Sequence, residues 1–230
     1  MIFSRYIYIA KTWHIWYITA MKYEDLLNKV SDVPCFTAKF LAAGEDLSQI
    51  RHQLDRWVKG QKIIRIHKGL YTVAEPYRKI RPEPFHIANN LKSASYISLQ
   101  SALAWYGMIP EFVPEITSVT TGRPQTIETP MGRFDFRHIN KTFFWGYRQL
   151  ELTAGQTAFI ARPEKALLDL VYLTAAGDKE DFIRELRLQN FEQIDRPALR
   201  EFAEKTRRPK LKKAVNNIET IIDSGEGLEL

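Results

Sequence analysis

The sequence has very little chemistry that could cross-link the chain or hold a metal. Among 230 residues there is one cysteine, Cys35, which excludes an internal disulfide. The histidines are scattered without the close spacing that zinc ligands need, at His14, His52, His67, His86 and His138. We therefore expect no metal site and no cofactor, and a reducing, cytoplasmic location.

Sequence signatures of catalysis are also missing. The chain has no glycine-rich phosphate loop of the standard forms, no GxSxG and no HExxH. A nucleotide-transferring enzyme would need carboxylates close together on a strand to hold Mg²⁺. The adjacent acidic pairs fall instead where helices are expected to begin, at Glu24/Asp25, Glu45/Asp46 and Glu180/Asp181, where they interact favourably with the helix dipole. We predict no catalytic residues and no enzymatic activity; a nucleotide-transferring enzyme is the least favoured alternative.

No uninterrupted apolar run is long enough to span a membrane, so we expect no membrane partner. The first twenty residues are apolar and aromatic, but Arg5, Lys11 and His14 interrupt them. A secretion signal would place its basic residues before a clean apolar stretch, whereas Lys11 falls within the stretch. Our hypothesis is that Met21 is the true start, so that residues 1–20 are an upstream extension of the reading frame; otherwise residues 1–21 form a disordered arm. An interfacial anchor is the alternative.

The excess of positive charge is concentrated in one segment. The chain has 33 basic and 27 acidic residues, a formal net charge of +6. Residues 46–81 carry nine basic and three acidic residues, whereas residues 82–230 carry 19 and 20. Such a local excess is typical of a surface that contacts a polyanion such as DNA, and a solvated basic face is the simpler alternative.

The residues before and within the basic segment have the pattern of three helices and a hairpin. Apolar residues at helical spacing predict a first helix, and Thr37 is placed to cap a second one. Asp46, with Gln49 three residues later, has the form of a capping box that opens a third helix. Two strands follow around a tight turn at Lys68-Gly69. We predict a winged helix-turn-helix domain over residues 22–80.

In a winged helix-turn-helix, the third helix enters the major groove of duplex DNA and the hairpin, or wing, lies along the phosphate backbone. Residues near the start of the third helix could then reach bases: Ser48, Gln49 and His52. The cations of this helix would meet phosphates or guanine edges: Arg51, Arg56 and Lys59. Those of the wing would hold phosphate: Lys62, Arg65 and Lys68. Winged helices also serve as protein-interaction modules, so the fold alone does not decide the function.

A proline-rich stretch separates this region from a second predicted domain. Pro76, Pro82 and Pro84 disfavour both helix and sheet, and we place the domain boundary there. Residues 82–223 are expected to form an α+β domain with a small antiparallel sheet and C-terminal helices. One hairpin of the sheet should span residues 118–129, and the tail, 224–230, should fray.

Two charged features of the second domain have plain interpretations. Lys165 and Asp169 lie four residues apart on an expected helix, which predicts an ion pair of modest worth. The run KTRRPKLKK, residues 205–213, has six basic residues and no acidic one. We interpret it as solvated surface, with a second phosphate-contacting strip as the alternative.

Several segments in a fixed order resemble one known family. They are IHKGLYTVAE, YISLQSALAWYGMIPE, ITSVTTGRPQ, TPMGRFDFRHI and IARPEKALLDLVYL. Over about residues 22–175 the chain is similar to the AbiEi-type antitoxins of abortive-infection (type IV) toxin-antitoxin systems. SALAWYG and PEKALLDL are the specific part of this resemblance.

The resemblance implies an N-terminal domain that binds DNA and represses its own operon, and a C-terminal domain that counters a nucleotidyltransferase-like toxin. The partners expected are therefore double-stranded DNA of its own promoter and a cognate toxin, and an oligomer is compatible with the pattern. The alternative is a winged-helix transcriptional regulator, or a protein-interaction module, without a toxin partner.

Overall fold

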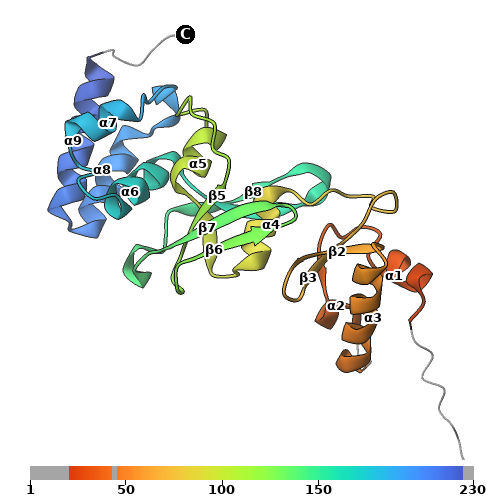
Figure 1. Cartoon of the computed structure of the whole chain (residues 1–230). Helices are drawn as coiled ribbons and strands as arrows, with labels where there is room; N and C mark the ends of the chain where they lie inside the picture. Colours follow the sequence, from red (N-terminus) through yellow and green to blue (C-terminus); the bar gives the residue numbers. More distant parts are fainter. Residues whose placement is uncertain (1–20, 43–45, 225–230) are drawn as a thin grey trace, which may run out of the picture.

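The computed structural model of the chain describes residues 21–42 and 46–224 (Figure 1). Within these residues the protein is a mixed α+β structure with nine α-helices and two β-sheets. Residues 1–20 of the predicted upstream extension lie outside the described part, as does most of the predicted tail. Met21, the proposed start, is 8% exposed and packs in the hydrophobic core that contains Leu26 and Leu41.

The N-terminal unit contains three helices and three short strands. Its core is built around Leu26, Leu41 and Leu54, all fully buried. The elements are α1 (Tyr23–Lys29), β1 (Phe36–Thr37), α2 (Ala38–Ala42), α3 (Leu47–Lys59), β2 (Ile63–His67) and β3 (Leu70–Val73). The strands form an antiparallel sheet in the order β1-β3-β2.

The beginnings of α2 and α3 are set by side-chain caps that the sequence predicted. The Phe40 N–H donates to the Thr37 hydroxyl oxygen at 3.1 Å. At α3 the Asp46 carboxylate accepts from the Ser48 N–H at 2.8 Å, so the cap is confirmed. The bond goes to the second residue of the helix, whereas the capping box predicted a bond to the third, Gln49.

The β2–β3 hairpin turns at Lys68-Gly69, as predicted. Gly69 has a φ of 82°, which a residue without a side chain adopts at little cost. Ile63 pairs with Val73 at the base of the hairpin, and His67 pairs with Leu70 beside the turn. Lys62 and Lys68 therefore stand at opposite ends of β2.

The larger sheet has six strands in the order β6-β7-β5-β4-β9-β8. Two neighbouring pairs, β4–β9 and β5–β7, are parallel, and the other three pairs are antiparallel. The predicted small antiparallel sheet is thus a mixed one. Its strands are β4 (Ser95–Ile97), β5 (Ile116–Thr120), β6 (Gln125–Thr129), β7 (Gly132–His138), β8 (Tyr147–Glu151) and β9 (Thr157–Ala161).

The predicted hairpin over residues 118–129 is wrong. Strand β5 does not pair with β6; it pairs in parallel with β7, where Ser118 lies opposite Phe136. The hairpin is formed one turn later, by β6 and β7 around Pro130-Met131, with Thr129 opposite Gly132. Gly122-Arg123-Pro124 is therefore a crossing between strands that are not neighbours.

Helices contact the larger sheet and also gather at one end of it (Figure 1). Helix α4 contacts β4, β5 and β9, and α5 packs on β5 and on α6. Helices α6, α8 and α9 pack on one another, and α7 packs on α9. Their bounds are α4 (Pro84–Leu91), α5 (Leu99–Trp105), α6 (Pro163–Leu173), α7 (Glu180–Glu185), α8 (Arg196–Thr206) and α9 (Pro209–Asp223).

The N-terminal unit lies at the opposite end of the sheet from this group of helices (Figure 1). Cys35, Ile66 and Leu70 belong to the same buried cluster as the larger sheet and its helices. The two units therefore share apolar contacts. The division into domains at the proline-rich stretch stays a prediction.

Candidate nucleic-acid interface

All nine residues that the sequence singles out for DNA contact are exposed in the structure. They come from α3, from β2 and from the two ends of β2, namely Ser48, Gln49, Arg51, His52, Arg56, Lys59, Lys62, Arg65 and Lys68. The apolar face of α3 accounts for this, because Ile50 and Leu54 are buried in the core of the N-terminal unit. The polar face of the helix is left toward solvent.

A pocket of about 460 Å³ brings some of these residues together. It lies where α2, α3 and the β2–β3 hairpin meet. Its charged lining consists of Lys39, Arg51, Asp55, Arg65 and Lys68. Four cations and one carboxylate from the described part of the chain share the pocket, so their summed charge is positive and suited to a phosphate-bearing ligand.

Helix α3 presents two adjacent exposed stripes, because residues four apart stack along one side of a helix. Leu47, Arg51 and Asp55 form the stripe that lines the pocket. The neighbouring stripe lies beside it on the exposed side of the helix and contains Ser48, His52, Arg56 and Lys59. The predicted phosphate-contacting Arg51 therefore lies on the pocket stripe, whereas Arg56 and Lys59 share the neighbouring stripe with the predicted base-contacting residues.

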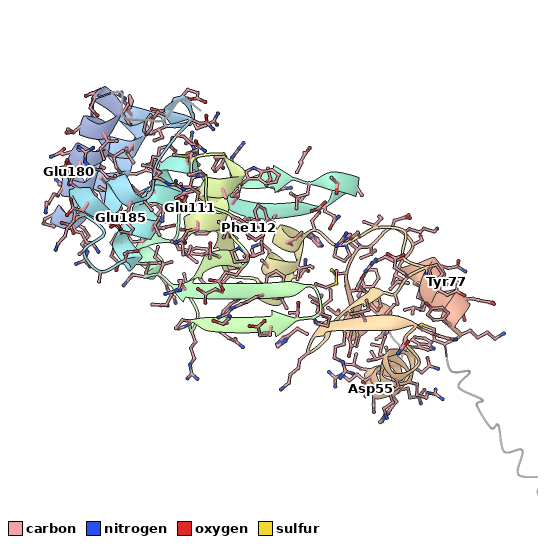
Figure 2. The ribbon with its side chains drawn as sticks, turned by 45° about the horizontal axis from the view of Figure 1, so that its top comes forward. Asp55, Tyr77, Glu111, Phe112, Glu180 and Glu185 are labelled. Atoms are coloured by element: carbon pink, nitrogen blue, oxygen red, sulfur yellow. The ribbon has the colours of Figure 1, made fainter. Side chains whose placement is uncertain are left out.

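Arg65 is already engaged within the pocket. Its guanidinium pairs with the Asp55 carboxylate and lies 5.5 Å from the centre of the Tyr71 ring. Figure 2 labels Asp55 on the N-terminal unit. Arg51 and Lys68 line the same pocket without an ion pair to any described carboxylate.

Lys62 is not brought into the pocket. Its ammonium lies 4.8 Å from the centre of the Tyr23 ring, beside α1, and its carbonyl accepts a hydrogen bond from the Tyr23 hydroxyl at 2.9 Å. The sequence grouped Lys62 with Lys68 because both flank β2, but a five-residue strand separates them.

Lys39 is a pocket residue that the sequence reasoning missed. It lies on α2, outside the segment with the concentrated charge. Its position in the sequence could have indicated that it is exposed, because it lies two residues after the Thr37 cap and on the side of a short helix opposite the buried Leu41. Only the packing of α2 against α3 brings it toward Arg51.

A second group of polar side chains is buried where α6 meets β4 of the larger sheet. Lys165 and Asp169 of α6 form an ion pair, and their side chains are each 3% exposed. Asp169 also accepts from the Tyr96 hydroxyl at 3.0 Å and the Ser98 hydroxyl at 2.8 Å. The ion pair predicted from the spacing is present, and it is buried, because residues 164–171 of α6 are all buried.

Burial changes the proton affinities of this network. Desolvation raises the pKa of Asp169 and lowers that of Lys165, so each moves toward its neutral form. Burial also raises the pKa of the Tyr96 hydroxyl, and the neighbouring Asp169 adds to the effect. The adjacent cavity is only about 10 Å³, which leaves no room for a substrate. The network joins α6 to β4 and serves as a structural connection.

Two further properties concern the described residues only. Across residues 21–42 and 46–224, no three His, Cys, Asp or Glu side chains are grouped so that they could hold a metal ion. No helix in this part of the chain combines the length and the apolar character needed to cross a bilayer.

Comparison with protein-family models and with curated proteins gives no match to this chain, so its function is inferred from its own residues and their geometry.

Proposed function

We propose that this protein is a DNA-binding antitoxin of the AbiEi type that represses its own operon. In this proposal the N-terminal unit is a winged helix-turn-helix that binds duplex DNA. The observation that carries it is the cationic pocket between α3 and the β2–β3 hairpin, where Arg51 and Lys68 have no ion pair with any described carboxylate. Arg51 on α3 and Lys68 in the hairpin turn lie at the positions from which a recognition helix and a wing would approach DNA.

The exposed residues of α3 suit the two kinds of contact that such a helix makes. In the proposed complex Ser48 and His52 face base edges in the major groove, and Arg56 and Lys59 continue the same stripe toward phosphates. Lys68, at the tip of the hairpin, contacts the backbone. Arg51 and Lys39 bind a phosphate that enters the pocket.

The proposed toxin-neutralising role rests on the resemblance and on the placement of its two specific segments. SALAWYG covers residues 101–107 on α5 and its last turn, and PEKALLDL covers residues 163–170 on α6. These helices pack against each other although they lie far apart in the chain. The two motifs therefore lie on two helices that contact each other, as expected if they stabilise one antitoxin domain that counters a nucleotidyltransferase-like toxin.

Removing three cations tests the DNA-binding proposal. Arg51→Ala, Arg56→Ala and Lys68→Ala, combined in the full chain, are expected to weaken binding to the protein's own upstream DNA. The slope of log affinity against log salt should fall by about 0.9 for each phosphate contact that the substitutions remove. Fluorescence anisotropy with labelled duplex, measured at several salt concentrations, gives both quantities.

Lys62→Ala is the matched control, because Lys62 has the same charge and lies on the same hairpin but outside the pocket. It should change the affinity little. Binding that ignores salt, or an equal reduction from Lys62→Ala and Lys68→Ala, would contradict the proposal. The N-terminal unit would then be better explained as a protein-interaction module.

Asp55→Asn is expected to strengthen binding to the same duplex by several fold. The substitution removes the only carboxylate that the described residues contribute to the pocket lining, and it releases Arg65 for phosphate. The slope with salt should become steeper, by about 0.9 if Arg65 makes one new phosphate contact. Glu75→Gln is the control, because Glu75 pairs with Arg78 on the same unit but outside the pocket. Weaker binding by Asp55→Asn would show that the pocket does not face DNA.

A further inference from the structure

The basic run at residues 205–213 divides into two groups in the folded protein. Three of its cations are bound locally: Lys212 pairs with Glu204, Lys213 pairs with Asp178, and Lys210 donates to the carbonyls of Tyr172 and Thr174. The other three have no ion pair with any described carboxylate: Lys205, Arg207 and Arg208. The first group is therefore engaged by neighbouring residues of the protein, whereas the second group can bind a ligand.

The three unpaired cations sit together where α8 turns into α9. Lys205 lies in the last turn of α8, Arg207 ends that helix with a φ of 54°, and Arg208 precedes the first residue of α9. All three are exposed. The corner therefore groups three positive charges within residues 82–230, whose 19 basic and 20 acidic residues nearly balance as a whole.

Aromatic rings hold two of these cations against the segment before β8. The Lys205 ammonium lies 4.3 Å from the centre of the Trp145 ring, and the Arg208 guanidinium lies 5.8 Å from that of Phe143. These contacts place the corner beside the beginning of β8.

Two exposed rings continue this surface along the sheet. Tyr147 of β8 is 36% exposed and Phe159 of β9 is 43% exposed, and their rings meet edge to face with centres 5.7 Å apart. Tyr147 also stacks on the buried Tyr96, which anchors it to the sheet. The neutral Gln149 lies directly opposite Phe159 on the same face, and Glu151 lies further along β8.

We propose that this surface binds single-stranded nucleic acid. We call it the aromatic-cationic strip, and it consists of Phe159, Tyr147, Trp145, Lys205, Arg207 and Arg208. Bases stack on Tyr147 and Phe159, and phosphates bind the three cations at the α8–α9 corner. Aromatic platforms next to unpaired cations are how proteins bind single strands without reading their sequence. In a duplex the base faces are already stacked on one another, so the exposed rings suit a single strand.

The strip lies on β8 and the segment before it, on β9 and at the α8–α9 corner, outside the N-terminal unit that contains the pocket between α3 and the hairpin (Figure 1). They share no residue. Single-strand binding by the strip therefore does not depend on the proposed duplex-binding function, and each can fail while the other holds.

The test uses the full chain in the Arg51→Ala, Arg56→Ala, Lys68→Ala background, which removes the proposed duplex-binding residues. The probes are fluorescein-labelled single-stranded RNA and single-stranded DNA of about 12 nucleotides, and the corresponding duplex. Fluorescence anisotropy at several salt concentrations gives affinities. Binding of both single strands supports a general backbone-and-base mode, and a preference for RNA identifies contacts to the 2′-hydroxyl.

In this background, Phe159→Ala is expected to weaken single-strand binding about fivefold or more, the effect of removing the platform for one stacked base. Arg207→Ala with Arg208→Ala should weaken it and lower the salt slope by about 0.7 for each phosphate contact that they remove. Lys212→Ala removes a cation that is already paired with Glu204, and it should have no effect.

Phe159→Leu separates stacking from folding, because leucine keeps an apolar side chain but has no aromatic face. It should weaken single-strand binding as Phe159→Ala does, while thermal unfolding stays close to that of the parent chain. Three results would overturn the inference: no single-strand binding in this background, a reduction from Lys212→Ala equal to that from the arginine pair, or full binding by Phe159→Leu.

Discussion

Replacing Lys165 by methionine is expected to lower the free energy of unfolding by about 3 to 5 kcal/mol. Methionine fills a similar volume, so the destabilisation comes from charge and not from a cavity. Asp169 would keep the Tyr96 and Ser98 hydroxyls as donors but would be deprived of its only cationic partner among the described residues. Chemical denaturation followed by circular dichroism measures the change. Lys213→Met, which removes the exposed partner of the half-buried Asp178, should cost about 1 kcal/mol or less.

The destabilisation from Lys165→Met should also depend on pH. Burial already raises the pKa of Asp169, and removing the ammonium raises it further. A carboxyl whose folded pKa lies above its unfolded value gives stability at low pH that is lost as pH rises. The variant should therefore be closest to the parent near or below the ordinary aspartate pKa of about 3.9, and furthest from it at neutral pH.

Adding Asp169→Asn to Lys165→Met checks the cause. The amide is neutral and can still accept from Ser98 and Tyr96, so part of the stability at neutral pH should return. A double variant no more stable than Lys165→Met at pH 7 would show that an unpaired charge is not the source of the destabilisation.

The full chain carrying Arg51→Ala, Arg56→Ala and Lys68→Ala is expected to lose repression in cells while still protecting them from the cognate toxin. An arginine contact to DNA contributes about 1 to 3 kcal/mol, so removing two of them together with Lys68 should reduce operator affinity well beyond tenfold. The substituted side chains are exposed, and α3 and the β2–β3 hairpin are well separated from α5 and α6 (Figure 1), so the antitoxin motifs should stay folded. A promoter reporter and a toxicity rescue assay, run on the same strains, measure the two activities.

Lys62→Ala serves again as the matched control and should retain both activities. If rescue disappears together with repression in a variant that still accumulates to the parent level, neutralisation depends on DNA binding. The assignment of the two activities to separate units would then be wrong.

The local features of the N-terminal unit were accessible from the sequence alone. The Thr37 and Asp46 caps, the apolar face of α3 and the Lys68-Gly69 turn each depend on a few consecutive residues. Side-chain spacing along α3 was enough to place the polar residues of its predicted DNA-contacting face in solvent, although the polar Gln53 is buried. Exposure of the candidate residues on α3 follows from the same spacing.

The pairing of strands in the larger sheet needed the tertiary structure. A turn sequence such as Gly122-Arg123-Pro124 indicates that the chain bends, but it does not specify which strand lies beside β5. The i, i+4 spacing of Lys165 and Asp169 was likewise visible in the sequence, but their burial was not, because the elements that cover α6 come from distant parts of the chain.

The sequence by itself determined where helices and turns begin and which face of α3 is polar, because those properties depend on neighbours within one or two turns. Tertiary structure alone decided that Lys39 joins Arg51 and Lys68 in one pocket, that Asp55 holds Arg65, and that Lys62 stays at Tyr23. It also decided which cations at the α8–α9 corner have no ion pair with a described carboxylate. These outcomes depend on distances between side chains from separate elements, and only packing of those elements sets such distances.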